Sequence, residues 1–418
     1  MRIGILGGGR LGLFYKLAVL VYILAVVILS YREGMTVYAK GAGLLLLGQF
    51  LFRITIGGER IFLPIEMRVL VGWFILGVLS SAFSKDPATA LPRIVTIAQV
   101  IPLGLILCNF IVWNGEGRFY WWSVLGAGVL SGALTLLSPQ SFTGIDGRVF
   151  GTLGNANAFA AMLATGVAIG ASTLVGSSPL WVRGIGLASA AFFLYLVGET
   201  GSRMGMLACL AAVVVIFICY QMTASVKRIG RLVAISVVGV SLVVGSLSLI
   251  SSSQFVSRLE ALTSAAEKGD FGAVGDNSLR DRAMLYRKAF ELTLENPLIG
   301  VGLDVFRTAD IRYRTIGNNS HSNYLEILAS TGIVGAILYF SMYFFWWRRL
   351  LYLRPLLRDE KLAGRYALSL AVAAQFLIFD LAWVNYYEKL AWVFLAGLIA
   401  ESHLLLRSVR QETRRLAF

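Results

Sequence analysis

Long apolar runs dominate this sequence and limit what it can fold into. A helix needs about 20 mostly apolar residues to cross a bilayer, and about twelve runs of that length are present. They lie at roughly 12–31, 36–56, 63–84, 93–113, 120–138, 157–176, 180–198, 204–222, 231–250, 323–347, 365–385 and 388–406. We therefore expect an all-α polytopic membrane protein with about twelve transmembrane helices.

The composition agrees with a membrane protein. Of the 418 residues, 57% are hydrophobic and 14% are charged, whereas soluble domains carry about 25% charged residues. The net charge of +14 is compatible with nucleic-acid binding, but basic cytoplasmic loops explain it more simply. Cys108, Cys209 and Cys219 lie in apolar runs, without the spacing of a disulfide framework or a metal site.

The distribution of cations predicts the orientation in the membrane. If the N-terminus is cytoplasmic, the short loops on that side hold most of the Lys and Arg residues, as the positive-inside rule requires. These cations include Lys227, Arg228, Arg231, Arg348, Arg349, Arg354, Arg358, Lys361, Arg407, Arg410, Arg414 and Arg415. We therefore expect both termini to be cytoplasmic.

The chain divides into three predicted parts. Residues 1–250 would form nine transmembrane helices, and 251–322 one long extracytoplasmic loop. Residues 323–418 would form the last three helices and a basic cytoplasmic tail. With this topology the long loop lies on the outer face, together with the polar stretches 148–157 and 199–203. Polar groups that converge on one face of a bilayer indicate a site there.

The N-terminus contains a glycine pattern that resembles a dinucleotide fingerprint. Gly7 to Gly12 has the spacing Gly-x-Gly-x-x-Gly, and Glu33 follows about 20 residues later. The fingerprint needs a soluble strand–turn–helix unit, whereas here the following helix is apolar all round. We therefore expect a basic cytoplasmic leader and no nucleotide site.

The long loop contains one predicted amphipathic helix, at about 279–295. Ser278 and Asp281 have the spacing of a capping box, and Asn296-Pro297 ends the helix. Its apolar stripe would consist of Leu279, Ala283, Tyr286, Phe290 and Thr293, with Arg287, Lys288 and Glu291 on the polar side. Arg282 falls within the apolar stripe, so it either extends to an edge or points at an anionic partner.

Several polar residues at the outer face are candidates for chemistry. His321 lies among Asn318, Asn319, Ser320, Ser322 and Asn323, and is either an ordinary polar residue or a general base. Arg203 follows a sharp turn and is either an interfacial cation or a fork for phosphate.

The acidic candidates and the second histidine have similar alternatives. Asp380 falls within the predicted helix 365–385, where a carboxylate is functional unless it reaches interfacial water. Glu326 could pair with a nearby Arg, and His403, near the inner end of the last helix, is expected to be structural. Because no Asp-x-Asp, Walker or His-Glu-x-x-His motif is present, the sequence favours a mechanism without metal or other cofactor.

An ordered set of short motifs connects these candidates. They are Gly-Thr-Leu-Gly-Asn-Ala-Asn (151–157), Thr-Gly-Ser-Arg (200–203), Arg282-x-x-x-Tyr286, Asn-Pro-Leu-Ile-Gly-Val-Gly-Leu-Asp-Val-Phe (296–306), His-Ser-Asn-Tyr-Leu-Glu (321–326) and Gly332-Ile-Val-Gly335. Over roughly 145–340 the chain resembles the O-antigen ligase and O-antigen polymerase superfamily of bacterial envelope glycan assembly. Two departures are Tyr286, where Trp is common, and Ala156, where Pro is common.

The resemblance implies a glycan transferase at the outer face of the cytoplasmic membrane. The donor would be a glycan on undecaprenyl diphosphate, and the acceptor a sugar hydroxyl of lipid A–core for a ligase or of a second lipid-linked glycan for a polymerase. By similarity Arg203 and Arg282 would hold the diphosphate and His321 would act as base. Further substrate-binding residues would be Arg148, Asn157, Asn323, Glu326 and Asp380. An alternative of another class is a transporter or flippase for a lipid-linked glycan.

Overall fold

The computed structural model describes residues 8–31, 34–144, 147–175, 178–223, 277–309, 319–355 and 359–416. Within these ranges the chain is helical, and its β pairing is one isolated bridge between Thr143 and Val149. The helices are α1 (Gly8–Leu24), η1 (Ala25–Leu29), α2 (Thr36–Thr55), α3 (Ile65–Ala82), α4 (Pro87–Asn114), α5 (Gly117–Leu137), η2 (Pro139–Ser141), η3 (Gly151–Leu153), α6 (Ala156–Ser172), α7 (Leu180–Glu199), α8 (Arg203–Thr223), α11 (Asn277–Glu295), α12 (Phe306–Ala309), α13 (Asn323–Tyr352), α14 (Glu360–Phe379) and α15 (Lys389–Leu416).

The helices confirm the predicted polytopic all-α membrane fold. In the described ranges, 10 helices are long and apolar enough to cross a bilayer, and each matches one predicted run. The predicted run at 157–176 corresponds to the shorter apolar helix Ala156–Ser172. The predicted run at 231–250 lies outside the described residues. The glycine pattern from Gly7 to Gly12 also differs from a nucleotide-binding turn, because the chain is already helical from Gly8 onward.

Local sequence signals set the helix ends. In α4, the Asp86 carboxylate accepts a hydrogen bond from the Thr89 backbone N–H, at 3.3 Å, and Pro87 occupies the first turn, where its missing N–H costs nothing. Gly115 follows the last turn with φ 68°, the left-handed conformation that favours glycine. With 28 residues, α4 is long enough to cross the whole bundle.

The centre of one half of the bundle is α6, which packs against α7, α8 and α14. Small residues allow this close approach, because a Cβ at Gly166 would lie 2.2 Å from the Phe193 ring. Gln375 of α14 adds a buried polar link by donating to the Ala164 carbonyl, at 2.8 Å. The three free cysteines, in α4 and α8, are buried, as predicted.

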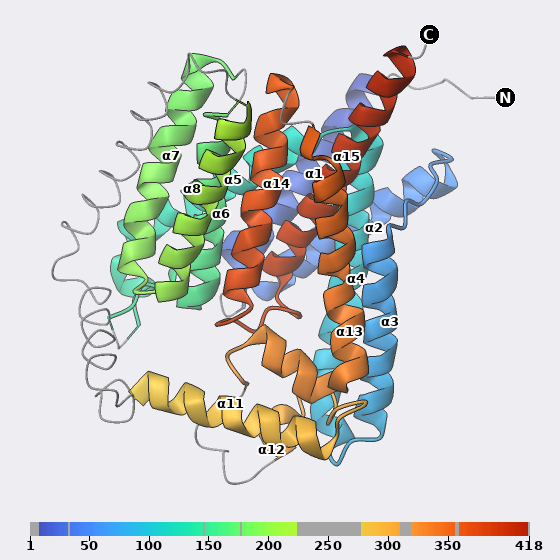
Figure 1. Ribbon diagram of the computed structural model, residues 1–418, viewed down its shortest axis with the longest axis vertical. Coiled ribbons are helices and arrows are strands. Elements are labelled where there is room, and N and C mark those ends of the chain that lie inside the picture. Colours follow the sequence, from blue (N-terminus) through green and yellow to red (C-terminus); the bar gives the residue numbers. More distant parts are fainter. Residues whose placement is uncertain are drawn as a thin grey trace.

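Helix α11 lies across one end of the bundle, roughly at right angles to the long helices (Figure 1). The start of α1 and the end of α15 lie together at the opposite end (Figure 1). The turn between α7 and α8 and the loop between α14 and α15 lie at the α11 end (Figure 1). The predicted convergence of polar stretches at one end is therefore present. Which end faces the outside stays a prediction.

The predicted apolar face of α11 was wrong in part. Phe290 is 58% exposed and Ala283 is exposed, whereas Lys288, expected on the polar side, is fully buried. The helix instead buries Leu285, Ala289 and Leu292 against Phe306 and Ala329. The burial of Lys288 is compatible with its charge because its ammonium group lies 4.5 Å from the centroid of the Phe306 ring.

Helix α13 is broken at Gly332. This residue has φ 66° and ψ −172°, and a Cβ there would lie 2.4 Å from the Leu298 carbonyl carbon. The segment after α11 enters the break, where Ile333 N–H donates to Pro297 O at 2.8 Å and Val301 N–H donates to Ala329 O at 2.9 Å. The break therefore joins the loop 296–302 to a short helical piece that starts next to His321.

Candidate functional site

The loop before α6 is fixed by backbone and side-chain hydrogen bonds. Asn155 caps α6, since its carboxamide oxygen accepts from the N–H groups of Asn157 and Ala158, at 2.9 and 3.1 Å. Thr152 donates to the carbonyl of Val27, at 2.7 Å, which holds the loop against the first transmembrane helix. The predicted site residue Asn157 therefore occupies a fixed position at the start of α6.

The turn between α7 and α8 is bound to the same loop. Arg148 Nε donates to the Thr200 carbonyl at 3.0 Å, and Ser202 Oγ donates to Asn157 Oδ1 at 3.0 Å. Asn157 Nδ2 in turn donates to the Ala382 carbonyl at 3.2 Å. Asn157 thus joins two segments that are distant in the sequence. Arg203, which begins α8 directly after Ser202, is half-buried.

The segment before α13 presents His321. Its φ of 54° lies in the left-handed region, which costs a non-glycine residue free energy unless its surroundings fix it. Here Asn319 Oδ1 accepts from the His321 backbone N–H at 3.0 Å, and Glu326 Oε2 accepts from the Ser320 N–H at 2.8 Å. Because these contacts fix the backbone, the imidazole is held in an exposed position.

Charge around His321 favours the neutral imidazole. The protein atoms packed around the partly exposed imidazole lower its pKa, and the positive charge of Arg282 lowers it further, while Asp281 acts in the opposite direction. A neutral imidazole at physiological pH can accept a proton. This is the state that a general base needs.

One cavity of about 300 Å³ brings four of the predicted site residues together. Arg148, Asn157, Arg282 and His321 all line it, although they come from three separate parts of the chain. Tyr286, one turn after Arg282, donates to the Leu381 carbonyl at 3.1 Å and so fixes α11 at the cavity. Two guanidinium groups and one imidazole facing a common space can bind an anion next to a base.

Three other predicted residues lie beneath the cavity and do not line it. Asn323, Glu326 and Asp380 are buried. The Asp380 carboxylate accepts from Tyr343 at 2.9 Å and from Asn385 at 2.6 Å. Asp380 lies just past the end of α14 at Phe379, so the helix is shorter than the predicted range 365–385.

Asn323 completes this support. Its Oδ1 accepts from the backbone N–H groups of Asn385 and Tyr386, at 3.2 and 3.3 Å. Its own N–H donates to the Asp380 carbonyl at 2.7 Å. The arrangement holds the start of α13 against the loop between α14 and α15, two segments that carry cavity residues. Arg203, by comparison, adjoins the cavity through its neighbour Ser202 and is not among the lining residues.

The cavity also contains residues that the sequence reasoning missed. Trp383, Tyr387 and Glu388 line it from the loop between α14 and α15, and Asp281 lines it from α11. The signal in the sequence was weak, because this loop is a few residues long and lies between two apolar runs. An acidic residue beside two tyrosines on the predicted outer face was the one available indication.

Arg93 is a further residue of the site whose structural role the sequence did not indicate. Its guanidinium forms an ion pair with Asp304, at 2.9 Å, and lies over the Tyr387 ring, 3.3 Å from the centroid. Asp304 adopts φ 62° in the Leu-Asp-Val-Phe motif. The pair therefore connects this motif to one wall of the cavity.

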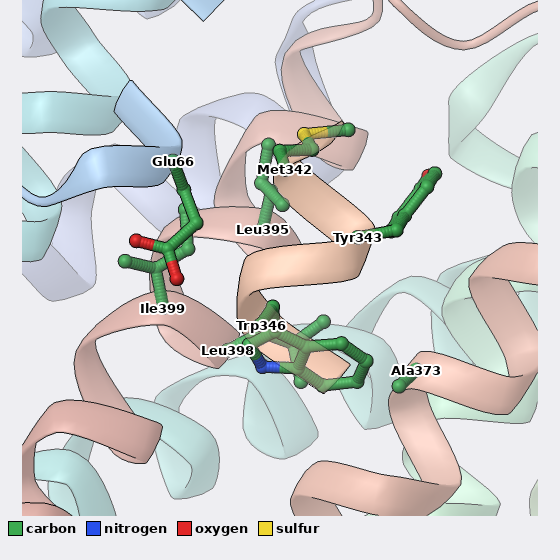
Figure 2. A pocket seen from close by; sticks show the side chains of 8 residues that line it. All are labelled: Glu66, Met342, Tyr343, Trp346, Ala373, Leu395, Leu398 and Ile399. Carbon is green, nitrogen blue, oxygen red and sulfur yellow. The ribbon is translucent and has the colours of Figure 1, made fainter. Parts of the chain in front are cut away.

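A second, much smaller cavity lies within the bundle (Figure 2). Its volume of about 10 Å³ suits one water molecule, and its walls are mostly apolar. Figure 2 shows the Glu66 side chain at this cavity together with Trp346 and Leu398. The Glu66 carboxylate pairs with Arg349, at 2.7 Å, and His403 Nε2 lies 3.8 Å from it. His403 thus takes part in a buried polar cluster within the transmembrane region.

Comparisons with known proteins bear on the family of this chain. Residues 188–340 match the family described as O-Antigen ligase. The matched range includes Arg203, Arg282 and His321, whereas Arg148, Asn157 and Glu388 lie outside it. A search of curated proteins gives no match. The resemblance inferred from the short sequence motifs is therefore confirmed over the part of the chain from α7 to α13.

Proposed function

We propose that this chain, a multi-pass membrane protein that carries the O-antigen ligase family domain at residues 188–340, transfers a glycan from undecaprenyl diphosphate to a sugar hydroxyl. The observation that carries the proposal is the shared cavity of Arg148, Arg282 and His321 at one end of the bundle. The cationic side chains suit a diphosphate, and the imidazole suits the hydroxyl that attacks. The family supports a membrane glycan transferase of the ligase or polymerase type.

The proposed chemistry is a direct displacement at the anomeric carbon. The acceptor oxygen forms a bond to this carbon, the bond to the phosphate oxygen breaks, and undecaprenyl diphosphate leaves with the electron pair. The acceptor proton passes to the neutral imidazole of His321. Such a displacement inverts the configuration at the anomeric carbon.

The cations supply most of the stabilisation in this scheme. Negative charge develops on the departing diphosphate, and a guanidinium aimed at it acts in the transition state more than in the ground state. Removal of one such donor typically costs about 10²–10³ in rate. Arg282 and Arg148 are placed for this role in the cavity, and Arg203 would reach the same anion from the start of α8. A general base typically contributes a factor of about 10²–10⁴ to the reaction rate.

The membrane orientation belongs to the proposal. The end opposite α11 carries the start of α1, the end of α15 and their cations, so the positive-inside rule assigns it to the cytoplasm. The cavity would then face the periplasmic side of the inner membrane, where the lipid tail of the donor can remain in the bilayer. Both a lipid A–core acceptor and a second lipid-linked glycan are compatible with this placement.

A transporter or flippase for a lipid-linked glycan is the alternative of another class. Transport sites commonly lie near the middle of the membrane between two halves of the protein. The site residues here gather at one end of the bundle, and the interior cavity at Glu66 measures about 10 Å³, far too small for a sugar. These observations favour a fixed reaction site.

Reconstitution tests the proposal. Purified protein is incubated in detergent with an undecaprenyl diphosphate-linked glycan and, separately, with a lipid A–core or a lipid-linked glycan acceptor. We expect a joined product whose mass identifies the acceptor and so separates a ligase from a polymerase. A folded wild-type protein that joins neither acceptor, yet moves the donor between the leaflets of a vesicle, would overturn the proposal in favour of transport.

A further inference from the structure

The cavity also contains an acidic group, which would not bind the diphosphate. Glu388 lines the same space as Arg148 and Arg282, and it comes from the loop between α14 and α15. A carboxylate repels a diphosphate but is a good acceptor of hydrogen bonds from hydroxyl groups. An acidic side chain in a cavity that also holds Arg148 and Arg282 can bind a ligand group other than the donor phosphates.

Glu388 is held in place by one contact. The hydroxyl of Tyr31, at the end of the first transmembrane helix, donates to Glu388 Oε2. Tyr31 itself packs against the loop before α6, since a Cβ at Gly154 would lie 3.4 Å from the Tyr31 Cβ. The carboxylate is thus fixed by a residue far away in the sequence, and Glu388 lines the cavity.

The electrical surroundings of Glu388 differ from those of His321. Burial raises the pKa of Glu388, while the Tyr31 hydroxyl and the cations Arg93 and Lys389 act in the opposite direction. The cation that acts on His321 is Arg282. Glu388 belongs to the wall formed by the loop between α14 and α15, where Arg93 lies over the neighbouring Tyr387 ring, whereas Arg282 and His321 line the cavity from α11 and from the segment before α13.

Aromatic side chains accompany the carboxylate. Tyr387 and Trp383 line the cavity within five residues of Glu388, and the Tyr387 ring is fixed by the Arg93 guanidinium at 3.3 Å from its centroid. A flat apolar face next to a hydrogen-bond acceptor matches a sugar, which has C–H faces and hydroxyl edges. Asn155 and Asn319 add amide groups to the same cavity.

We propose that the wall formed by Trp383, Tyr387 and Glu388 is the acceptor-sugar subsite, in which Glu388 accepts a hydrogen bond from a hydroxyl of the acceptor and Tyr31 positions Glu388. The assignment rests on the proposed function for the location of the donor. In a direct displacement the acceptor oxygen approaches opposite the departing diphosphate. With the diphosphate at the guanidinium groups, the acceptor sugar lies along the wall that contains Glu388, and its attacking hydroxyl extends to His321 in the same cavity.

Two substitutions test the proposed hydrogen bonds of Glu388 and keep the approximate size of each side chain. Glu388→Gln keeps the shape and an oxygen that can accept from Tyr31, but removes the charge. Tyr31→Phe removes only the hydroxyl. Loss of a hydrogen bond to a charged group corresponds to about a 10- to 100-fold weaker affinity. For Tyr31→Phe we expect a smaller loss, since the carboxylate remains.

Binding is measured by titration of the purified full-length protein in detergent, without turnover. One probe is the lipid A–core or the glycan of the lipid-linked acceptor released from its diphosphate, and the other is undecaprenyl diphosphate without sugar. We expect Glu388→Gln to weaken binding of the acceptor by about 10- to 100-fold and to leave binding of undecaprenyl diphosphate unchanged. Arg282→Ala should show the opposite pattern.

The combination of both substitutions identifies the positioning role of Tyr31. If Tyr31 acts through Glu388, the double variant should bind the acceptor no more weakly than Glu388→Gln alone. A merely structural role would instead weaken both probes and lower the melting temperature. Additive losses in the double variant would overturn the positioning role.

The outcomes separate this subsite from the proposed reaction. If wild-type protein forms no product but the two probes still respond to different substitutions, the reaction is wrong and the subsite stands. If product forms and Glu388→Gln binds both acceptors as the wild type does, the subsite is wrong and the reaction stands. Equal weakening of the sugar and the diphosphate probes, or no binding of either sugar by the wild type, would also overturn the subsite.

Discussion

At the scale of single residues, the site depends on charges that the fold gathers from distant positions. The sequence was sufficient to select Arg148, Asn157, Arg282 and His321, because each is a polar residue in an outer segment with motif neighbours. It was insufficient for Glu388, whose significance depends on contacts across the fold, such as the Tyr31 hydroxyl. Whether the selected residues carry the reaction is a prediction, as are the roles of Arg203, Asn323, Glu326 and Asp380.

Arg282→Ala tests the cationic stabilisation of the leaving group. We expect a rate loss of about 10²–10³ with an unchanged melting temperature, because the guanidinium faces a cavity and not the core. The matched control is Arg287→Ala on the same helix, which is 77% exposed and pairs with Glu291 at 2.9 Å. The measurement is initial transfer rate at saturating acceptor. Equal losses in both variants would contradict the role of Arg282.

The pH profile tests His321 as the base. The pKa of His321 lies below the usual 6.5 of histidine, so the imidazole is neutral at physiological pH. Activity should fall as the pH drops through this lowered pKa. Asp281→Asn removes the charge that raises this pKa. The acid limb of kcat/KM should therefore move to lower pH.

The control for this shift is Glu295→Gln, at the exposed end of the same helix. It should leave the acid limb in place. The imidazole is excluded as the base if Asp281→Asn and His321→Ala both retain activity and the acid limb of kcat/KM stays at the same pH in both.

At the scale of elements, the helices were predictable and their faces were less so. Apolar length identifies a span in any fold, which is why the predicted runs and the observed helices agree. The buried face of α11 was wrong in part because its partners, Phe306 and Ala329, come from later segments. A helical wheel contains no information on which neighbour the helix will meet, and Lys288 was assigned to solvent for that reason.

Gly332→Ala tests the break in α13. Its backbone lies in a region open essentially to glycine alone, and a Cβ would lie 2.4 Å from Leu298, so we expect a loss of about 1–3 kcal/mol in stability. Gly72→Ala in α3 is the control, since a Cβ there has nothing within 4 Å. Thermal unfolding in detergent measures both. Equal melting temperatures for the two variants would show that the break is not required.

At the scale of the whole molecule, the fold class and the membrane topology follow from very general physics. A bilayer requires satisfied backbone groups, and the cation distribution sets the orientation. The position of the cavity did not follow from these rules. It depends on α11 crossing the end of the bundle and on the junction of three loops at Asn157, both of which need tertiary contacts (Figure 1).

The measurement that tests the central claim most directly is donor protection of a cysteine in the cavity. Asn319→Cys is placed in a background without the three buried cysteines, and Arg60→Cys, in the short segment between α2 and α3 that the cation distribution assigns to the cytoplasm, is the control. A membrane-impermeant maleimide is added to intact spheroplasts with and without undecaprenyl diphosphate. We predict that Asn319→Cys reacts from outside and that the lipid diphosphate protects it, while Arg60→Cys reacts only after lysis. Labelling of Arg60→Cys from outside, or labelling of Asn319→Cys that the lipid diphosphate leaves unchanged, would contradict a diphosphate-binding cavity on the outer face.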